Sequence, residues 1–151
     1  MAADNWQIFD SAKEKIGDGT VDLDTHSFKV ALWTSTTPPG QTDDSYTTVA
    51  ATGGEVANGS GYTTGGWPVT GVTWVEAAGT VTFDMDNPTW TMSGASLTCR
   101  YAVLYDDSDA SKSLIAESLL NNTPGDIVIA DGDTLEIQIA AGGVFTVSGG
   151  W

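Results

Sequence analysis

The chain has 151 residues, 40% of them hydrophobic, so it is long enough and apolar enough to bury a core and is not disordered throughout. Twenty Asp or Glu residues face five Lys or Arg residues, and the formal net charge of −15 argues against nucleic acid and anionic membranes as partners. The single cysteine, Cys99, excludes an internal disulfide framework and a metal site built from several cysteines.

The beginning of the chain carries no recognisable targeting signal. Residues 1–6 have neither a basic region nor an apolar run. No stretch approaches the ~20 apolar residues that cross a membrane. We therefore expect one domain over residues 1–151, made in a cytoplasm.

The first predicted element is a short amphipathic helix over residues 4–17. Asp4 suits the N-cap position, and Gly17 suits the end of the helix. The apolar face of this helix packs on its own sheet or, as an arm, on a neighbouring subunit. That face consists of residues at helical spacing: Trp6, Phe9, Ala12 and Ile16.

A half-buried strand follows at Phe28–Leu32, where apolar side chains alternate with others. Pro38 and Pro39 end it, and residues 35–66 then form a long irregular region rich in Gly, Thr, Ser and Asp. Loops of this length are usually functional or disordered, and binding contacts concentrate on loops. We expect the partner contacts here first.

The rest of the chain reads as short strands separated by turn residues. The strongest strand covers residues 97–105, with one face built from Leu97, Cys99, Tyr101, Val103 and Tyr105. About eight strands at regular spacing, without strand–helix alternation, predict an all-β fold. We expect an antiparallel β-sandwich or jelly-roll-like domain with one short N-terminal amphipathic helix. The other predicted strands are 69–75, 80–85, 89–92, 113–119, 127–130, 135–139 and 144–147. Strands 69–75 and 80–85 are expected to form a hairpin, with its turn at Ala77–Gly79.

The sequence offers little for catalysis. The only histidine, His26, lies in a polar segment and is expected at the surface, and no Gly-x-Ser-x-Gly motif is present. Two acidic residues could serve a small hydrolase, but the candidates have a simpler explanation in turns. These candidates are Asp84 with Asp86, the cluster at Asp106–Asp109, and Asp131 with Asp133. We therefore predict no enzyme and no catalytic residues.

Metal and cofactor sites are not predicted either. The stretch Asp18–Asp24 offers several carboxylates at a spacing that suits calcium, but it lacks the closing Glu of an EF-hand loop. Acidic side chains in a solvated loop are the preferred interpretation, with a bound calcium ion as the alternative. The glycine pairs in residues 59–66 lack the Lys and Ser or Thr of a phosphate-binding loop.

The six tryptophans are more numerous than packing of such a chain requires. Trp33 and Trp74 lie within predicted strands and are expected in the core, whereas Trp67 and Trp90 lie near turns and are expected as exposed contacts. Stacking on a sugar ring is a second use of an exposed tryptophan. The predicted partner-binding residues are Trp6, Phe9, Ile16, Pro38, Pro39, Tyr46, Tyr62, Trp67, Trp90 and the terminal Trp151.

Several segments together resemble a family of small structural (virion) proteins of tailed bacteriophages. They are Gly17–Thr25 with Phe28–Leu32, Gly61–Gly66, Arg100–Tyr105 and Gly132–Leu135, and their order is similar along nearly the whole chain. The resemblance implies a particle component without catalytic residues. It further implies a capsid decoration (cement) protein on the outer surface of the virion, made in the host cytoplasm.

This resemblance sets the expected partners. A decoration protein binds the major capsid protein and stabilises the head, and shell symmetry favours a homo-oligomer, for which we expect a homotrimer. The helix at residues 4–17 and the loop at 38–66 are the expected docking elements. A tail or head–tail connector component is the alternative, and a carbohydrate-binding adsorption module is the alternative from another class.

Overall fold

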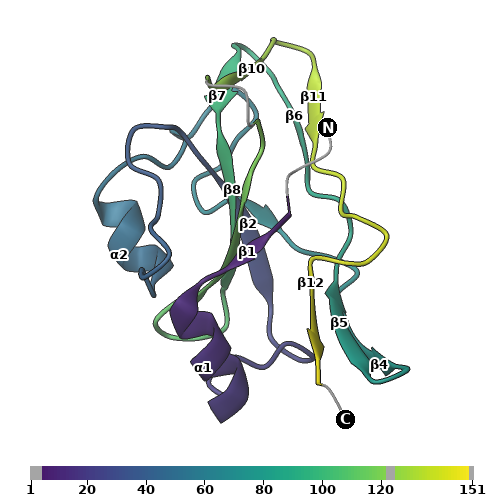
Figure 1. Cartoon of the computed structure of the whole chain (residues 1–151). Coiled ribbons are helices and arrows are strands. Elements are labelled where there is room, and N and C mark those ends of the chain that lie inside the picture. Colours follow the sequence, from purple (N-terminus) through teal and green to yellow (C-terminus); the bar gives the residue numbers. More distant parts are fainter. Residues whose placement is uncertain (1–4, 122–124, 150–151) are drawn as a thin grey trace.

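The computed structural model of the protein describes residues 5–121 and 125–149, and it is built from two stacked layers of antiparallel strands (Figure 1). The larger layer is a five-stranded sheet. Its strands, from one edge to the other, are β1 (Gln7–Ile8), β9 (Leu114–Leu119), β8 (Tyr101–Asp106), β2 (Phe28–Trp33) and β3 (Trp67–Pro68). The prediction of an all-β antiparallel fold is confirmed.

The second layer contains a three-stranded sheet and a short ribbon. The sheet runs β12 (Phe145–Ser148), β5 (Thr80–Asp84), β4 (Thr73–Ala77), and the ribbon pairs β11 (Thr134–Glu136) with β6 (Thr89–Thr91). One further ribbon, β10 (Ile127–Ile129) with β7 (Leu97–Cys99), lies beyond the N-terminal end of β8.

The main core fills the space between the two layers. Phe28 of β2 meets Phe83 of β5 edge to face, with ring centroids 5.4 Å apart, and Phe83 stacks on Phe145 of β12 at 5.3 Å. All three side chains are buried. Aromatic contacts across the layers therefore join the two sheets, as the predicted alternation on residues 28–32 and 80–85 requires.

A second core covers the opposite face of the five-stranded sheet. The helices α1 (Asp10–Asp18) and α2 (Tyr46–Ala51) lie on this side (Figure 1). The two central strands, β2 and β8, are consequently buried on both faces. The buried residues of this second core are Phe9, Ala12, Ala31, Trp33, Tyr46, Val49, Val103, Tyr105 and Leu114.

The N-terminal helix is shorter than predicted. It begins at Asp10, and residues 7–8 instead form β1, which pairs with Glu117 and Ala116 of β9. The extended backbone continues through Phe9, whose N–H donates to the carbonyl of Ile115 at 3.1 Å. Pairing with a sheet edge satisfies these N–H and C=O groups better than an isolated helical turn does. The predicted cap, Asp4, lies outside the described residues.

The prediction of one continuous strand over residues 97–105 is wrong. The strand breaks at Arg100, where the chain shifts by one residue, so Leu97 and Cys99 share the inter-layer core with Ala102 and Leu104 rather than with Val103. Both backbone groups of Arg100 bond to other segments: its N–H donates to Trp33 and its carbonyl accepts from Leu120. A break of this kind reverses which side chains face the core.

The region 35–66 is more ordered than predicted, because it contains the helix α2 and it ends against β3.

The turn of the hairpin formed by β4 and β5 lies where it was predicted. Ala78 and Gly79 have φ values of 53° and 83°, as in a type I′ turn, which follows the natural twist of paired strands. The strand β4 begins at Thr73, four residues later than predicted, since the N–H of Val69 still donates to Phe28.

Candidate interaction surface

One carboxylate, that of Glu55, holds several parts of the long loop together. Its Oε2 accepts a hydrogen bond from the Tyr46 hydroxyl, and its Oε1 accepts from the Tyr62 hydroxyl and from the N–H of Gly65, each at 2.7 Å. Hydrogen bonds to a charged acceptor are about twice as strong as neutral ones. Glu55 thus ties together three parts of a region expected to be irregular.

Aromatic rings continue this attachment into the sheet. Tyr105 of β8 stacks on Tyr46 with ring centroids 4.0 Å apart and planes 9° from parallel, and its hydroxyl donates to the carbonyl of Gly65 at 2.8 Å. Trp33 meets Tyr46 edge to face at 5.9 Å. We refer to Glu55, Tyr46, Tyr62 and Tyr105 as the Glu55 cluster.

The tyrosines of the Glu55 cluster stay neutral at physiological pH. Burial raises the pKa of Tyr46, Tyr62 and Tyr105 well above the ordinary value, and the nearby carboxylate of Glu55 raises each pKa further. Each hydroxyl therefore keeps its proton and can donate it. The attachment of the loop does not depend on these groups changing charge.

The backbone of the loop lies directly on the sheet next to this cluster. Gly66 has a φ of 86°, and a Cβ at this position would be 2.1 Å from the carbonyl oxygen of Val30. Gly61 is equally close to β6, because its Cβ would be 2.1 Å from the carbonyl oxygen of Thr91. Only glycine allows both contacts. The Gly-rich composition of residues 59–66 thus serves close packing rather than looseness.

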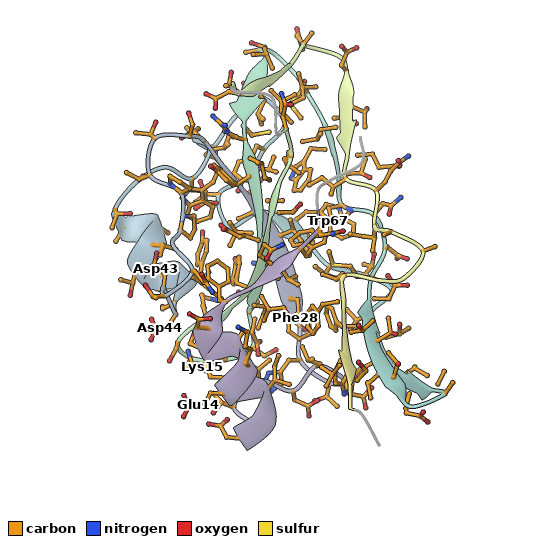
Figure 2. All side chains as sticks on the ribbon, viewed as in Figure 1. Glu14, Lys15, Phe28, Asp43, Asp44 and Trp67 are labelled. Atoms are coloured by element: carbon orange, nitrogen blue, oxygen red, sulfur yellow. The ribbon has the colours of Figure 1, made fainter. Side chains whose placement is uncertain are left out.

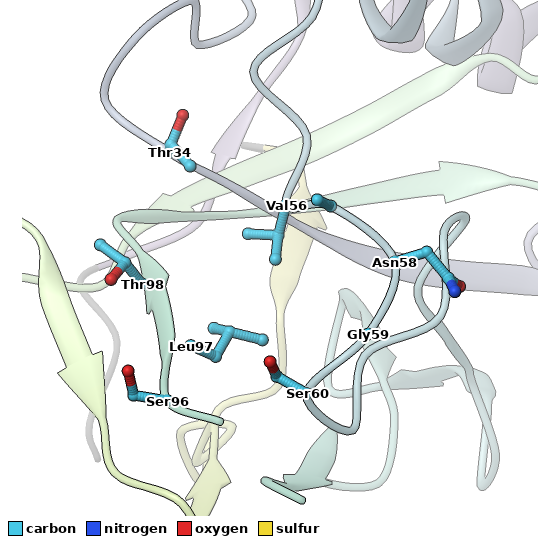
Figure 3. A pocket seen from close by; sticks show the side chains of 9 residues that line it. Thr34, Val56, Asn58, Gly59, Ser60, Ser96, Leu97 and Thr98 are labelled. Atoms are coloured by element: carbon cyan, nitrogen blue, oxygen red, sulfur yellow. The ribbon is translucent and has the colours of Figure 1, made fainter. Parts of the chain in front are cut away.

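A shallow hollow opens between this loop and β7 (Figure 3). Its volume is about 260 Å³. Val56 and the largely buried Leu97 provide its apolar surface, and hydroxyl and amide groups surround them. We call this the loop hollow. The residues that line it are Thr34, Val56, Ala57, Asn58, Gly59, Ser60, Ser96, Leu97 and Thr98.

The loop hollow is uncharged and its edge is held in place. Between Ser45 and Gly66, Glu55 is the one charged residue of the sequence, and its carboxylate is used within the cluster. Ser60 adopts a left-handed conformation with a φ of 53°, and its carbonyl accepts the N–H of Ser93 at 3.3 Å. Backbone strain in a fixed loop is typical of positions where geometry matters for binding.

A second groove lies between β3 and β6, with a volume of about 230 Å³. Trp67, Pro68 and the hydroxyl groups of Thr63, Thr89 and Thr91 are among its lining residues. Trp67, labelled in Figure 2, is half-buried and packs against the main core. We call this the Trp67 groove.

The predicted partner-binding residues divide into two groups. Pro38 is exposed, and Trp6, Ile16 and Trp67 are half-buried, so all four have surface to offer. The other described residues of the set are buried within the chain and have little surface to offer a partner, and the prediction that Trp90 is an exposed contact is wrong. They are Phe9, Pro39, Tyr46, Tyr62 and Trp90. Trp151 lies outside the described residues.

The outcome for the tryptophans follows from strand pairing. Trp90 is only 5% exposed because it lies opposite Leu135 in the β6–β11 ribbon and faces the main core beside Tyr62. Trp33 is fully buried as predicted. Trp74 is half-buried at the edge of the main core, so its assignment to the core holds in part.

Four of the basic residues, Lys13, Lys15, Lys29 and Lys112, engage acids or a backbone carbonyl. Lys29 and Lys112 both pair with Asp107, and Lys15 on α1 donates to the carbonyl of Asp44 at 3.3 Å (Figure 2). His26 is half-buried, and its Nδ1 lies 2.6 Å from Oδ2 of the fully buried Asp106. Most of the remaining acidic surface therefore has no cation beside it.

The acidic loop at residues 18–24 uses its carboxylates in local turns. Asp18 accepts the N–H of Thr20, and Asp22 accepts the Thr25 hydroxyl and the N–H of Asp24, and these hydrogen bonds lower the pKa of both carboxyls. Within residues 5–121 and 125–149, no group of three or more His, Cys, Asp or Glu side chains could hold a metal ion. The same residues include no helix long and apolar enough to cross a membrane.

A carboxyl group that sequence analysis missed lies under the N-terminal segment. Glu117 of β9 lines a small cavity of about 150 Å³ with Gln7, Ile8, Phe9 and Gln41, and its Oε2 is buried without a hydrogen-bond partner. Burial, and to a lesser degree the negative charge of Asp43, raises the pKa of Glu117 to about 7. The alternation of residues in the predicted strand did not indicate that Glu117 is buried, because the neighbouring strand β1 was not predicted.

Comparisons of the chain with protein-family models, with curated proteins and with solved structures found no match. The function must therefore be inferred from the surface of this chain itself.

Proposed function

We propose that this protein is a bacteriophage virion structural protein, a capsid decoration (cement) protein that binds the major capsid protein and stabilises the head. The observation that carries the proposal is the uncharged loop hollow on a loop fixed by the Glu55 cluster. A surface that is already ordered loses little conformational entropy on binding. Such a surface suits permanent attachment to a repeated site on a particle.

The distribution of charge supports the same role. The net charge of −15 makes most of the surface repel other acidic proteins, whereas the loop between Ser45 and Gly66 displays no free charge. We expect the loop hollow to face the capsid and receive a protruding segment of the capsid protein. The acidic remainder then faces solvent and keeps decorated particles apart.

A binding role, not catalysis, also fits how the acidic pairs are used. Asp84 accepts the N–H of Met85, Asp86 accepts the Thr70 hydroxyl, and Asp131 accepts the N–H of Gly94. Each of these carboxylates accepts a hydrogen bond from within the fold, two of them from segments distant in sequence. We therefore propose that the protein is not an enzyme.

The test uses particles of the phage that encodes the chain, prepared without it. Purified protein is added, unbound protein is removed, and the copies per particle are counted by mass spectrometry, with the position located by electron cryomicroscopy. We expect many copies on the head and greater resistance of the head to heat. Binding at one end of the particle indicates the tail or head–tail connector instead, and absence from the particle contradicts the proposal.

Two matched variants locate the contact. Ser96→Lys places a cation in the loop hollow, and we expect it to raise the dissociation constant for the particle at least tenfold, equivalent to about 1.4 kcal/mol. Thr146→Lys makes the same change in charge on an exposed residue of β12, and we expect it to bind like the unaltered protein. If both variants bind equally well, the loop hollow is not the contact.

A carbohydrate-binding adsorption module is the second candidate, and the Trp67 groove favours it. An indole beside several hydroxyl groups suits the apolar face and the hydroxyls of a neutral sugar. The test is a glycan array with Trp67→Ala as the control, which must lose any binding seen. Silence of the unaltered protein on the array contradicts this candidate and leaves the particle test unaffected.

A further inference from the structure

The strand β4 is an unpaired edge of the three-stranded sheet. It pairs with β5 on one side, and outside that ladder no backbone hydrogen bond of the described residues involves residues 73–77. A free edge presents N–H and C=O groups that a further strand can bind. The question is which strand fits.

The turn determines which backbone groups of β4 are free. The residues flanking a type I′ turn exchange both backbone hydrogen bonds, and here these are Ala77 and Thr80. By alternation, Val75 and Thr73 also bond to β5. The N–H and C=O groups of Trp74 and Glu76 therefore point away from the sheet.

Little along β4 hinders pairing at this edge, and its one charged residue is Glu76. Natural edge strands carry Lys, Pro or a bulge that hinders further pairing. The segment Thr73–Ala77 has neither Lys nor Pro, and its pairing with β5 is continuous. Val75 is 58% exposed, a high value for a large apolar side chain. An edge without Lys, Pro or a bulge is open to pairing with another strand.

We propose that β4 pairs with β4 of a second copy, antiparallel across a two-fold axis at Val75, forming a continuous six-stranded sheet. In this register the two free residues match: Trp74 lies opposite Glu76 of the partner copy, and they exchange both hydrogen bonds. The two Val75 side chains then form a non-hydrogen-bonded pair, which brings them closest together. No two like charges lie directly opposite each other.

Net charge predicts how this contact responds to salt. Two copies of charge −15 repel each other, and salt screens that repulsion. We therefore expect tighter dimerisation at high salt, the opposite of what an ion-pair contact shows. The contact is two-fold, so the purified chain forms dimers, not the trimer expected from shell symmetry.

The experiment measures the mass of the purified chain by sedimentation equilibrium, up to about 1 mM protein and in about 1 M NaCl, where the Debye length is about 3 Å. We expect a dimer, with amide exchange slowed at Trp74 and Glu76 as the protein concentration rises. A monomer under these conditions overturns the inference. An oligomer in which those amides exchange freely also overturns it.

Two pairs of variants separate strand pairing from misfolding. Glu76→Pro removes an outward N–H, and we expect the dissociation constant to rise at least tenfold relative to Glu76→Ala. Both variants lose the hydrogen bond from the Gly79 N–H to the Glu76 carboxylate, so this loss cancels. Val75→Lys places two cations opposite each other and should weaken the dimer, whereas Val147→Lys on β12 should not. Equal dimerisation within either pair contradicts the β4 contact.

This inference does not depend on the proposed virion role. It concerns the purified chain alone, whereas the particle test concerns the loop hollow. A dimer that fails to bind particles leaves the inference standing, and a particle-bound monomer leaves the proposed function standing.

Discussion

The hydroxyl of Tyr62 donates a hydrogen bond to Oε1 of Glu55 at 2.7 Å and also accepts the backbone N–H of Leu32 at 3.1 Å. One side chain thus connects the carboxylate of a loop residue to the main chain of the central strand β2. Through this connection, the order of the loop and the stability of the sheet are coupled. Removing the carboxylate should therefore affect the whole domain.

We predict that Glu55→Ala lowers the free energy of unfolding by about 3 kcal/mol, because two tyrosine hydroxyls and the N–H of Gly65 lose their acceptor. Denaturation by guanidinium, followed by tryptophan fluorescence, measures the change. Glu14→Ala, at an exposed position of α1, is the control and should stay within about 0.5 kcal/mol of the unaltered protein. Equal stability of the two variants means that the cluster contributes little.

The second prediction concerns two glycines with opposite surroundings. Gly66→Ala should destabilise the protein by about 3 kcal/mol or more, since its φ is 86° and the added methyl group would collide with the carbonyl of Val30. Gly17→Ala should stabilise it by about 0.5–1 kcal/mol, because Gly17 is helical and has nothing within 4 Å of the new methyl group. Thermal unfolding of both variants shows whether the two shifts have opposite signs.

The third prediction is a dependence of stability on pH that arises from Glu117. Its pKa is about 7 in the folded protein and near 4.5 in the unfolded chain, so the folded state binds more protons between these values. The contribution of Glu117 to the free energy of unfolding is then greatest below about pH 4.5, and it falls as the pH rises to about 7. The fall is at most about 3 kcal/mol for a shift of this size.

Glu117→Gln tests this assignment, because an amide of the same shape does not titrate. We expect the variant to be more stable than the unaltered protein at pH 8, and the difference to vanish near pH 4.5. Urea denaturation across this range measures it, with Glu14→Gln as a control that keeps the original pH dependence. An unchanged slope between pH 4.5 and 7 in Glu117→Gln would assign the effect to another group.

The fourth prediction concerns the thiol of Cys99. The side chain is fully buried between the layers, and burial, with the negative charge of Asp126 adding to it, raises its pKa to about 12. The native protein should therefore resist a thiol-specific disulfide reagent at pH 8 and react with one equivalent only after unfolding. Rapid labelling without denaturant would show that the region around β7 opens readily.

Much of the sandwich could be predicted from alternation alone. Residues 28–32 and 80–85 alternate clearly, and both form strands whose apolar side chains meet in the main core. The all-β class, the turn near Ala78 and the burial of Trp33 followed from such patterns. These features depend on neighbours in sequence, which is why the sequence predicts them.

Other features depend on pairing with distant segments. The helix α1 starts late because β1 pairs with β9, more than a hundred residues away along the chain, and nothing in residues 5–9 announces that. The break at Arg100 likewise requires Trp33 and Leu120. A local pattern contains no information about such partners.

The Glu55 cluster was missed for a similar reason, although one signal was present. Glu55 stands alone as a charged residue between Ser45 and Gly66, in a segment with two tyrosines. An isolated acid among hydroxyl and glycine residues can indicate a buried acceptor. Tyr46 and Tyr62 were expected to bind a partner, and instead they bind this acid within the chain.

The attachment of residues 35–66 also bears on proteolysis. A protease must draw an extended segment of several residues into its active site, and long irregular loops are usually where cleavage occurs. Here residues 46–66 contain a helix, lie against β2 at Gly66 and have their acid bonded to two tyrosines, so this part of the loop cannot leave the surface without breaking the Glu55 cluster. Digestion within residues 46–66 should therefore be governed by unfolding of the domain as a whole.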